Sequence, residues 1–93
     1  MRNYKIFKTN EFIKKFNTID KRLFNVISKK LKNQIYPQLK KNPYYGPHIK
    51  KLRDTKQLTL RHRTGDFRIF YYVSEKDKIV YILSIDNRKD AYK

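Results

Sequence analysis

A glycine-aspartate pair between two runs of β-forming residues constrains the fold of this chain more than any other feature. Gly65-Asp66 has the composition of a two-residue β-hairpin turn. The pair therefore predicts two antiparallel strands, at residues 57–63 and 67–73. With this turn, Arg63 lies opposite Arg68.

The two predicted strands have one basic and one apolar face, because side chains alternate between the faces of a sheet. The basic face carries Arg61, Arg63, Arg68 and Tyr72. The other face needs a core, and its apolar members are Leu58, Leu60, Phe67, Ile69, Tyr71 and Val73. His62 shares this second face, where we expect a partly buried, hydrogen-bonded histidine and not a catalytic one. A register shifted by one residue would expose the whole apolar set, so burial independently favours this pairing.

The segments before the hairpin predict a short strand and a pair of helices. Residues 3–8 have the length and content of a strand, and Asn10 can cap a helix that follows. An apolar stripe of helical spacing comprises Phe12, Phe16, Ile19, Leu23, Val26, Ile27, Leu31 and Ile35. The stripe predicts a short helix, then a longer one.

Two features set the limits of the longer helix. The stripe is interrupted at residues 17–20, where Thr18 or Asp20 can cap the second helix. Pro37 removes a helical hydrogen bond, so the helix should end or kink by Tyr36.

The remainder of the chain predicts a loop and one more strand. Residues 42–47 hold two of the three prolines and one of the two glycines, which is typical of a main loop. A strand is predicted at residues 78–85, and its continuous apolar run indicates an inner position covered on both faces. The order of elements predicts a single α+β domain over residues 1–93. We expect the helices on one face of a four-stranded sheet, with an antiparallel three-stranded meander.

The charge of the chain calls for an anionic partner. Lys and Arg number 24 against 8 Asp and Glu, a formal charge of +16. This field would bind polyphosphates by counterion release, and an acidic protein would neutralise it equally well. The carboxylates are scattered and cysteine is absent, so we expect no metal site and no cofactor. Residues 1–5 lack the apolar run of a signal peptide, and no stretch is long enough for a membrane span, so we expect a cytoplasmic protein.

The order of elements and two motifs resemble the RelE/ParE superfamily of bacterial and archaeal toxins. The stretch from Arg61 to Arg68 resembles the basic strand, the glycine-aspartate turn and the aromatic-arginine start of the next strand in that family. Residues 85–93 resemble its closing segment, in which an arginine, here Arg88, is followed a few residues later by a tyrosine, here Tyr92. The resemblance covers nearly the whole chain and implies a toxin that a small acidic antitoxin neutralises.

The resemblance leaves two activities open. RelE-like members are endoribonucleases that cut mRNA in the ribosomal A site, whereas ParE-like members poison DNA gyrase on the same fold. The residue types favour the ribosome-dependent mRNA endoribonuclease, with mRNA and the ribosome as partners. A gyrase inhibitor and a non-catalytic basic RNA- or ribosome-binding protein are the alternatives.

The resemblance also implies roles for individual residues. Arg68 would bind the scissile phosphate, and Arg61 would activate the 2′-hydroxyl or share the phosphate. Arg88 would lie near the departing 5′-oxygen, and Tyr92 would stack on a base or donate a proton. Some relatives carry a second lysine on the strand before the turn, where this chain has Thr59. The residues expected to hold RNA are Arg63, Lys50 and Lys51. His48 is either an ordinary loop residue or a residue for proton transfer.

Overall fold

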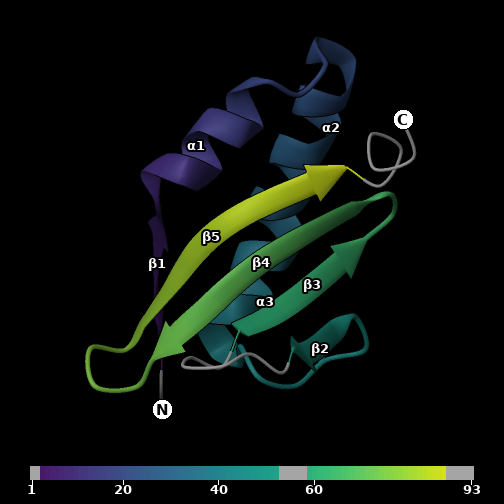
Figure 1. Cartoon of the computed structure of the whole chain (residues 1–93). Coiled ribbons are helices and arrows are strands. Elements are labelled where there is room, and N and C mark those ends of the chain that lie inside the picture. The colour runs from purple at the N-terminus through teal and green to yellow at the C-terminus, as the bar shows by residue number, and fades with distance from the viewer. Residues whose placement is uncertain (1–2, 53–58, 88–93) are drawn as a thin grey trace.

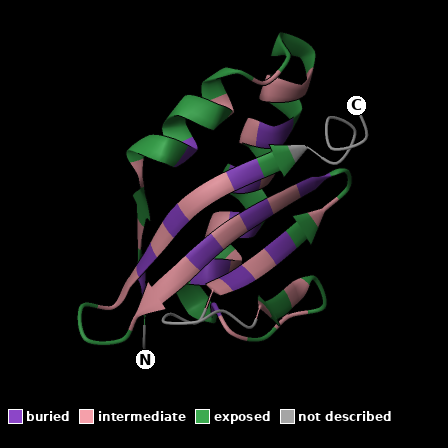
Figure 2. Ribbon diagram, viewed as in Figure 1, coloured by how far each residue is buried: buried purple, intermediate pink, exposed green. Residues whose placement is uncertain are grey.

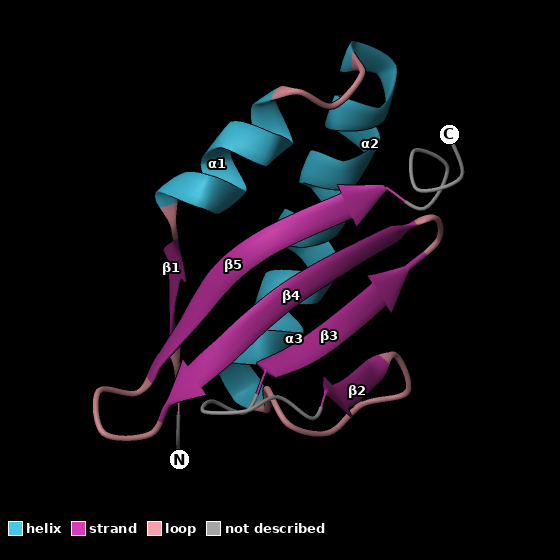
Figure 3. Cartoon of the chain, viewed as in Figure 1, coloured by secondary structure: helices cyan, strands magenta, loops and turns pink. Residues whose placement is uncertain are grey.

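The computed structural model describes residues 3–52 and 59–87 (Figure 1). The elements are, in order, β1 (Lys5–Lys8), α1 (Asn10–Asn17), α2 (Lys21–Lys30), a π-helical turn η1 (Leu31–Ile35), α3 (Tyr36–Lys41), β2 (Ile49–Leu52), β3 (Thr59–Thr64), β4 (Phe67–Ser74) and β5 (Ile79–Asn87). Figure 3 shows the strands in front of α2 and α3, with α1 alongside β5. The predicted α+β order is confirmed. No helix in the described ranges has the length and apolar character needed to cross a membrane.

The sheet has five strands in the order β1-β5-β4-β3-β2, one more than predicted. β1 pairs in parallel with β5, and the other neighbours are antiparallel. The predicted inner position of β5 is confirmed, since it lies between β1 and β4. The prediction that both of its faces are covered is wrong, because the described helices pack on one side of the sheet only (Figure 1). The additional strand is β2, from a segment that follows the main loop and in which no strand was predicted. Its Ile-Lys-Lys-Leu sequence does not alternate, and only pairing with β3 makes it a strand.

The helix caps fall close to their predicted places. Thr9, and not Asn10, caps α1, because its Oγ1 accepts a hydrogen bond of 3.3 Å from the backbone N–H of Phe12. Asp20 caps α2 by accepting from the N–H of Arg22 at 2.9 Å, one of the two predicted alternatives.

Pro37 alters the second helix without ending it. The helix α2 ends at Lys30, and the N–H of Tyr36 donates to the carbonyl of Leu31, five residues back. This wider turn lets a new α-helix begin at Tyr36 with Pro37 in its first turn. A proline costs little there, because its missing N–H would have no intrahelical partner.

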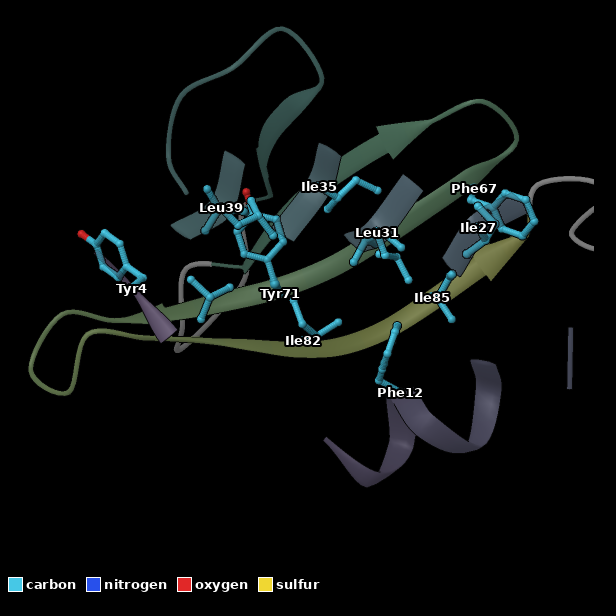
Figure 4. Close-up of a cluster of buried hydrophobic side chains, with 13 residues drawn as sticks. Tyr4, Phe12, Ile27, Leu31, Ile35, Leu39, Phe67, Tyr71, Ile82 and Ile85 are labelled. Carbon is cyan, nitrogen blue, oxygen red and sulfur yellow. The ribbon is translucent and has the colours of Figure 1, made fainter. Parts of the chain in front are cut away.

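The helices pack on one face of the sheet around one core. Figure 2 shows buried and partly buried residues alternating along β3 and β4. The buried hydrophobic residues are Tyr4, Phe12, Ile27, Leu31, Ile35, Leu39, Leu60, Phe67, Ile69, Tyr71, Val80, Ile82 and Ile85 (Figure 4). At its centre the buried hydroxyl of Tyr71 donates to the carbonyl of Pro43 at 2.6 Å, which joins the main loop to β4. The apolar face predicted for the hairpin is therefore confirmed over its described residues.

A β-bulge explains the apolar run of β5. Tyr71 pairs with Ile82, but Phe70 pairs with Ser84, so β5 has one extra residue at this point. Because of this residue, Ile82 and Ile85 both face the core although three positions separate them. The carbonyl of Ile82 accepts hydrogen bonds from the N–H and the hydroxyl of Thr9, at 3.2 and 2.7 Å.

Candidate functional site

The β3–β4 hairpin places three arginines on the face of the sheet opposite the helices. Gly65 has φ +56°, a conformation that glycine adopts without strain, and forms the two-residue turn with Asp66. The observed register pairs Arg63 with Arg68 and Arg61 with Phe70, as predicted. We call Arg61, Arg63 and Arg68 the arginine face.

The arginine face keeps its positive charge. Arg63 and Arg68 are direct cross-strand neighbours, an arrangement in which like charges repel. Asp86 lies opposite Arg68 on β5, but its carboxylate pairs with Lys15 at 3.4 Å. Within residues 3–52 and 59–87, no carboxylate forms a salt bridge with any of the three arginines. An anion bound here would offset their mutual repulsion.

A solvent-open cavity of about 600 Å³ adjoins the arginine face. It is lined by Pro47, His48, Ile49, Lys50, Arg61, Arg63 and Gly65. The pairing of β2 with β3 puts Lys50 opposite Arg61, and the N–H of Arg63 donates to the carbonyl of His48 at 3.0 Å. Within the described part of the chain, the lining contains no acidic side chain. Among the described residues the buried Nε of Arg61 has no hydrogen-bond partner, so it is a donor suited to a bound anion.

The two histidines of the chain have different environments. His62 is 4% exposed, and its Nε2 lies 3.1 Å from Oε1 of Gln38. Burial lowers the pKa of His62 to about 4, and the neighbouring His48, with ring centroids 5.9 Å apart, adds to this effect. His62 is therefore neutral at pH 7. Its contact with Gln38 agrees with the predicted hydrogen bond, but the side chain is more deeply buried than predicted. His48 is exposed and lines the cavity with Arg61 and Arg63.

A glycine makes room for the contact of His62. A Cβ added at Gly46 would lie 2.1 Å from Nε2 of Gln38. The main loop thus passes close to the amide that holds His62, and it brings His48 to the cavity two residues later. In the described ranges, no group of three or more His, Cys, Asp or Glu residues could hold a metal ion.

The structure gathers some of the predicted site residues and separates others. Arg61, Arg63 and Arg68 lie together, and Lys50 lines the cavity beside Arg61. Lys51 does not join them, because it pairs with Leu60, whose side chain lies on the other face of the sheet. The Nζ of Lys51 lies 5.4 Å from the ring centroid of Tyr45. Arg88 and Tyr92 lie outside the described residues. The position of His48 beside Arg61 was not predictable, because it depends on the unpredicted strand β2.

Known proteins share both the sequence pattern and the fold. Residues 6–92 match the profile of a family described as the ParE toxin of the type II toxin-antitoxin system parDE. The fold is similar to that of a chain of the Mycobacterium tuberculosis toxin-antitoxin complex RelBE2, with a TM-score of 0.72 and 21% identity over 92% of this chain and 99% of that chain. A chain of the archaeal RelE-RelB complex from Pyrococcus horikoshii OT3 has a TM-score of 0.66 and 24% identity over 92% and 96% of the two chains. The isolated Escherichia coli RelE toxin has a TM-score of 0.61 and 18% identity over 90% and 83%. No match was found among curated proteins.

Proposed function

The chain belongs to the ParE toxin family of type II toxin-antitoxin systems, and from this premise we propose that it is a toxin that cuts mRNA on the ribosome. The observation that carries this proposal is the arginine face, with three guanidinium groups that form no salt bridge in the described part of the chain, next to a cavity of cationic lining. A guanidinium donates to two phosphate oxygens at once and keeps its charge at physiological pH. A phosphodiester is the ligand that suits such a face.

The proposed reaction uses the RNA's own nucleophile. The 2′-oxygen forms a bond to the adjacent phosphorus, the bond from phosphorus to the 5′-oxygen breaks, and the products are a 2′,3′-cyclic phosphate and a 5′-hydroxyl. Arg68 holds the scissile phosphate, and Arg61 shares it or orients the 2′-hydroxyl. The role of both is to stabilise the charge that builds up on the phosphate, a task that requires no metal ion.

The reaction also moves two protons. The 2′-hydroxyl gives one up, and the departing 5′-oxygen takes one. His48 is the residue of the cavity whose side chain suits the first transfer, since imidazole accepts protons readily and it lies beside Arg61. Arg88 and Tyr92 are proposed for the departing oxygen on the resemblance alone. Lys50 and Arg63 bind the flanking phosphates, and Lys51 is proposed to contact RNA farther from the cavity.

Expression in growing cells tests this function. Wild-type protein should produce cuts in translated mRNA, seen by primer extension, and Arg68→Ala should reduce cleavage about a hundred- to thousandfold. Arg22→Ala is the matched control, because it removes the same charge from a side chain that is 92% exposed on α2. Intact transcripts in cells that make folded wild-type protein would refute the proposal.

A second function is favoured by the family match itself, whose description names parDE. A gyrase inhibitor of this fold would leave mRNA whole and produce broken DNA, so DNA integrity is measured in the same cultures. A basic RNA- or ribosome-binding protein without toxicity would leave growth unaffected. Whether the toxin acts on mRNA or on gyrase, we expect the cationic chain to bind an acidic antitoxin. This expectation is supported by the solved structures of similar fold, which include toxin-antitoxin complexes.

A further inference from the structure

A row of aromatic rings crosses the face of the sheet that carries the arginines. Phe7 on β1 pairs in register with Tyr81 on β5, and Tyr81 pairs with Tyr72 on β4. The ring centroids of Phe7 and Tyr81 are 5.5 Å apart. Those of Tyr81 and Tyr72 are 5.1 Å apart, with ring planes only 13° from parallel. We call Phe7, Tyr81 and Tyr72 the aromatic row.

The aromatic row and the arginine face form one surface. Arg68, Phe70 and Tyr72 are alternate residues of β4, so their side chains point to the same face at intervals of roughly 7 Å. Phe70 is partly buried and lies between the two sets. Lys5, which is exposed, shares the face of Phe7 on β1. A few nucleotides of an extended single strand would span the surface from Arg68 to the row.

The rings are not fully covered by the domain. Phe7 is 53% exposed, and Tyr72 and Tyr81 are partly buried. The helices lie on the other side of the sheet (Figure 1). Cross-strand packing alone accounts for the contacts between the rings. The packing leaves the ring of Phe7 accessible at the outer end of the row, on the same face as the arginines.

We propose that the aromatic row is a stacking site for bases of a single-stranded RNA whose phosphates lie on the arginine face. Flat rings beside cations on an open sheet suit this ligand, because every base has a face that can stack and the backbone needs positive charge. The inference rests on the proposed RNA substrate but not on cleavage. According to this inference, the row binds the nucleotides on one side of the cleaved phosphate. The row therefore sets how many nucleotides on that side contact the protein.

The test measures binding of fluorescently labelled oligouridine to the full chain by anisotropy, with a trinucleotide and a nonanucleotide. Phe7→Ala and Tyr81→Leu should each weaken binding of the nonanucleotide by about 5- to 100-fold, the usual effect of losing one stacked base. Tyr81→Phe should bind like the wild type, because it keeps the ring. Binding of the trinucleotide should be unchanged in all three variants. Arg68→Ala should weaken binding of both RNAs.

Two controls separate stacking from a structural role. Val26→Ala shortens an apolar side chain that is 50% exposed on α2 and not part of the row, and it should leave binding unchanged. Duplex RNA, whose bases are already stacked, should bind the wild type and Phe7→Ala equally. Thermal melts confirm that each variant is folded.

The possible failures are distinguishable. If Phe7→Ala and Tyr81→Leu bind the nonanucleotide like the wild type while Arg68→Ala does not, the row is no stacking site and the proposed function stands. If the two variants instead lose binding to an acidic antitoxin peptide and keep RNA binding, the row belongs to a protein partner and the inference is wrong. If the wild type binds neither single-stranded RNA but still cuts mRNA in cells, the inference is wrong and the proposed function stands. If it neither binds these RNAs nor cuts mRNA in cells, both proposals fail.

Discussion

Arg63 and Arg68 face each other across the β3–β4 hairpin, as two like charges in direct cross-strand register. Removing one charge should therefore stabilise the free protein while weakening RNA binding. We expect Arg63→Ala to raise the free energy of unfolding by up to about 1 kcal/mol at low ionic strength. Screening by salt should shrink this gain. Urea unfolding at low and high salt measures it, with Arg22→Ala as the control. A loss of stability in Arg63→Ala at low salt would contradict the prediction.

His48 lines the same cavity as Arg61, and its proposed task is proton transfer. His48→Ala should lower the single-turnover cleavage rate on programmed ribosomes by about a hundred- to ten-thousandfold. Affinity for RNA should change little, since the arginines remain. Asn25→Ala, at an exposed position of α2, serves as the control. Cleavage by His48→Ala at the wild-type rate would exclude this role.

His62 should make the protein less stable in weak acid. Its pKa is about 4 in the folded state and 6.5 in the unfolded chain. The unfolded state therefore binds a proton first, so stability is complete above pH 6.5 and falls as the pH drops towards 4. The loss has an upper limit of about 3 kcal/mol. Urea unfolding of wild type and His62→Gln between these pH values measures it. Equal pH dependence in the two proteins would show that His62 does not contribute.

Glu75 connects three parts of the chain. Its carboxylate accepts hydrogen bonds from the hydroxyls of Tyr4, at 2.6 Å, and Tyr44, and it pairs with Lys78. The hydrogen bond from Lys78, followed by those from Tyr4 and Tyr44, lowers its pKa from 4.5 to about 2. The carboxylate thus stabilises the fold above pH 4.5, and this contribution is lost as the pH falls through 2.

Glu75→Gln should accordingly lower the melting temperature at neutral pH by a few degrees. The difference from the wild type should shrink as the pH falls through 2, because the carboxylate then takes up a proton and becomes uncharged like the amide. Scanning calorimetry at the two pH values measures this. Lys76→Gln, at an exposed position in the same turn, is the control. A difference that persists undiminished near pH 2 would mean that Glu75 acts through packing and not through charge.

The parts of the fold that could be predicted are those determined by neighbouring residues. The turn at Gly65-Asp66 and the alternation around it define the register of the hairpin, and so the shared face of Arg61, Arg63 and Arg68. The position of His62 on the face that carries the core residues follows from the same alternation, although its side chain is more deeply buried than predicted.

The parts that could not be predicted depend on distant partners. β2 is a strand only because the edge of β3 accepts it, and His48 reaches the cavity by the same pairing. The sequence does not indicate the bulge in β5, because Leu83, the extra residue, is one of several apolar residues in an uninterrupted run. The π-helical turn before Pro37 is one of several ways to accommodate a proline, and the core selects among them.

The parallel pairing of β1 with β5 has a consequence for synthesis. The first strand of the described chain finds its neighbour only in the last one, more than seventy residues later. On a translating ribosome the sheet therefore stays incomplete until residues 79–87 have emerged from the exit tunnel. A toxin with this topology completes its sheet only after β5 has been made, so chains that terminate before residue 79 should be harmless to the cell that makes them.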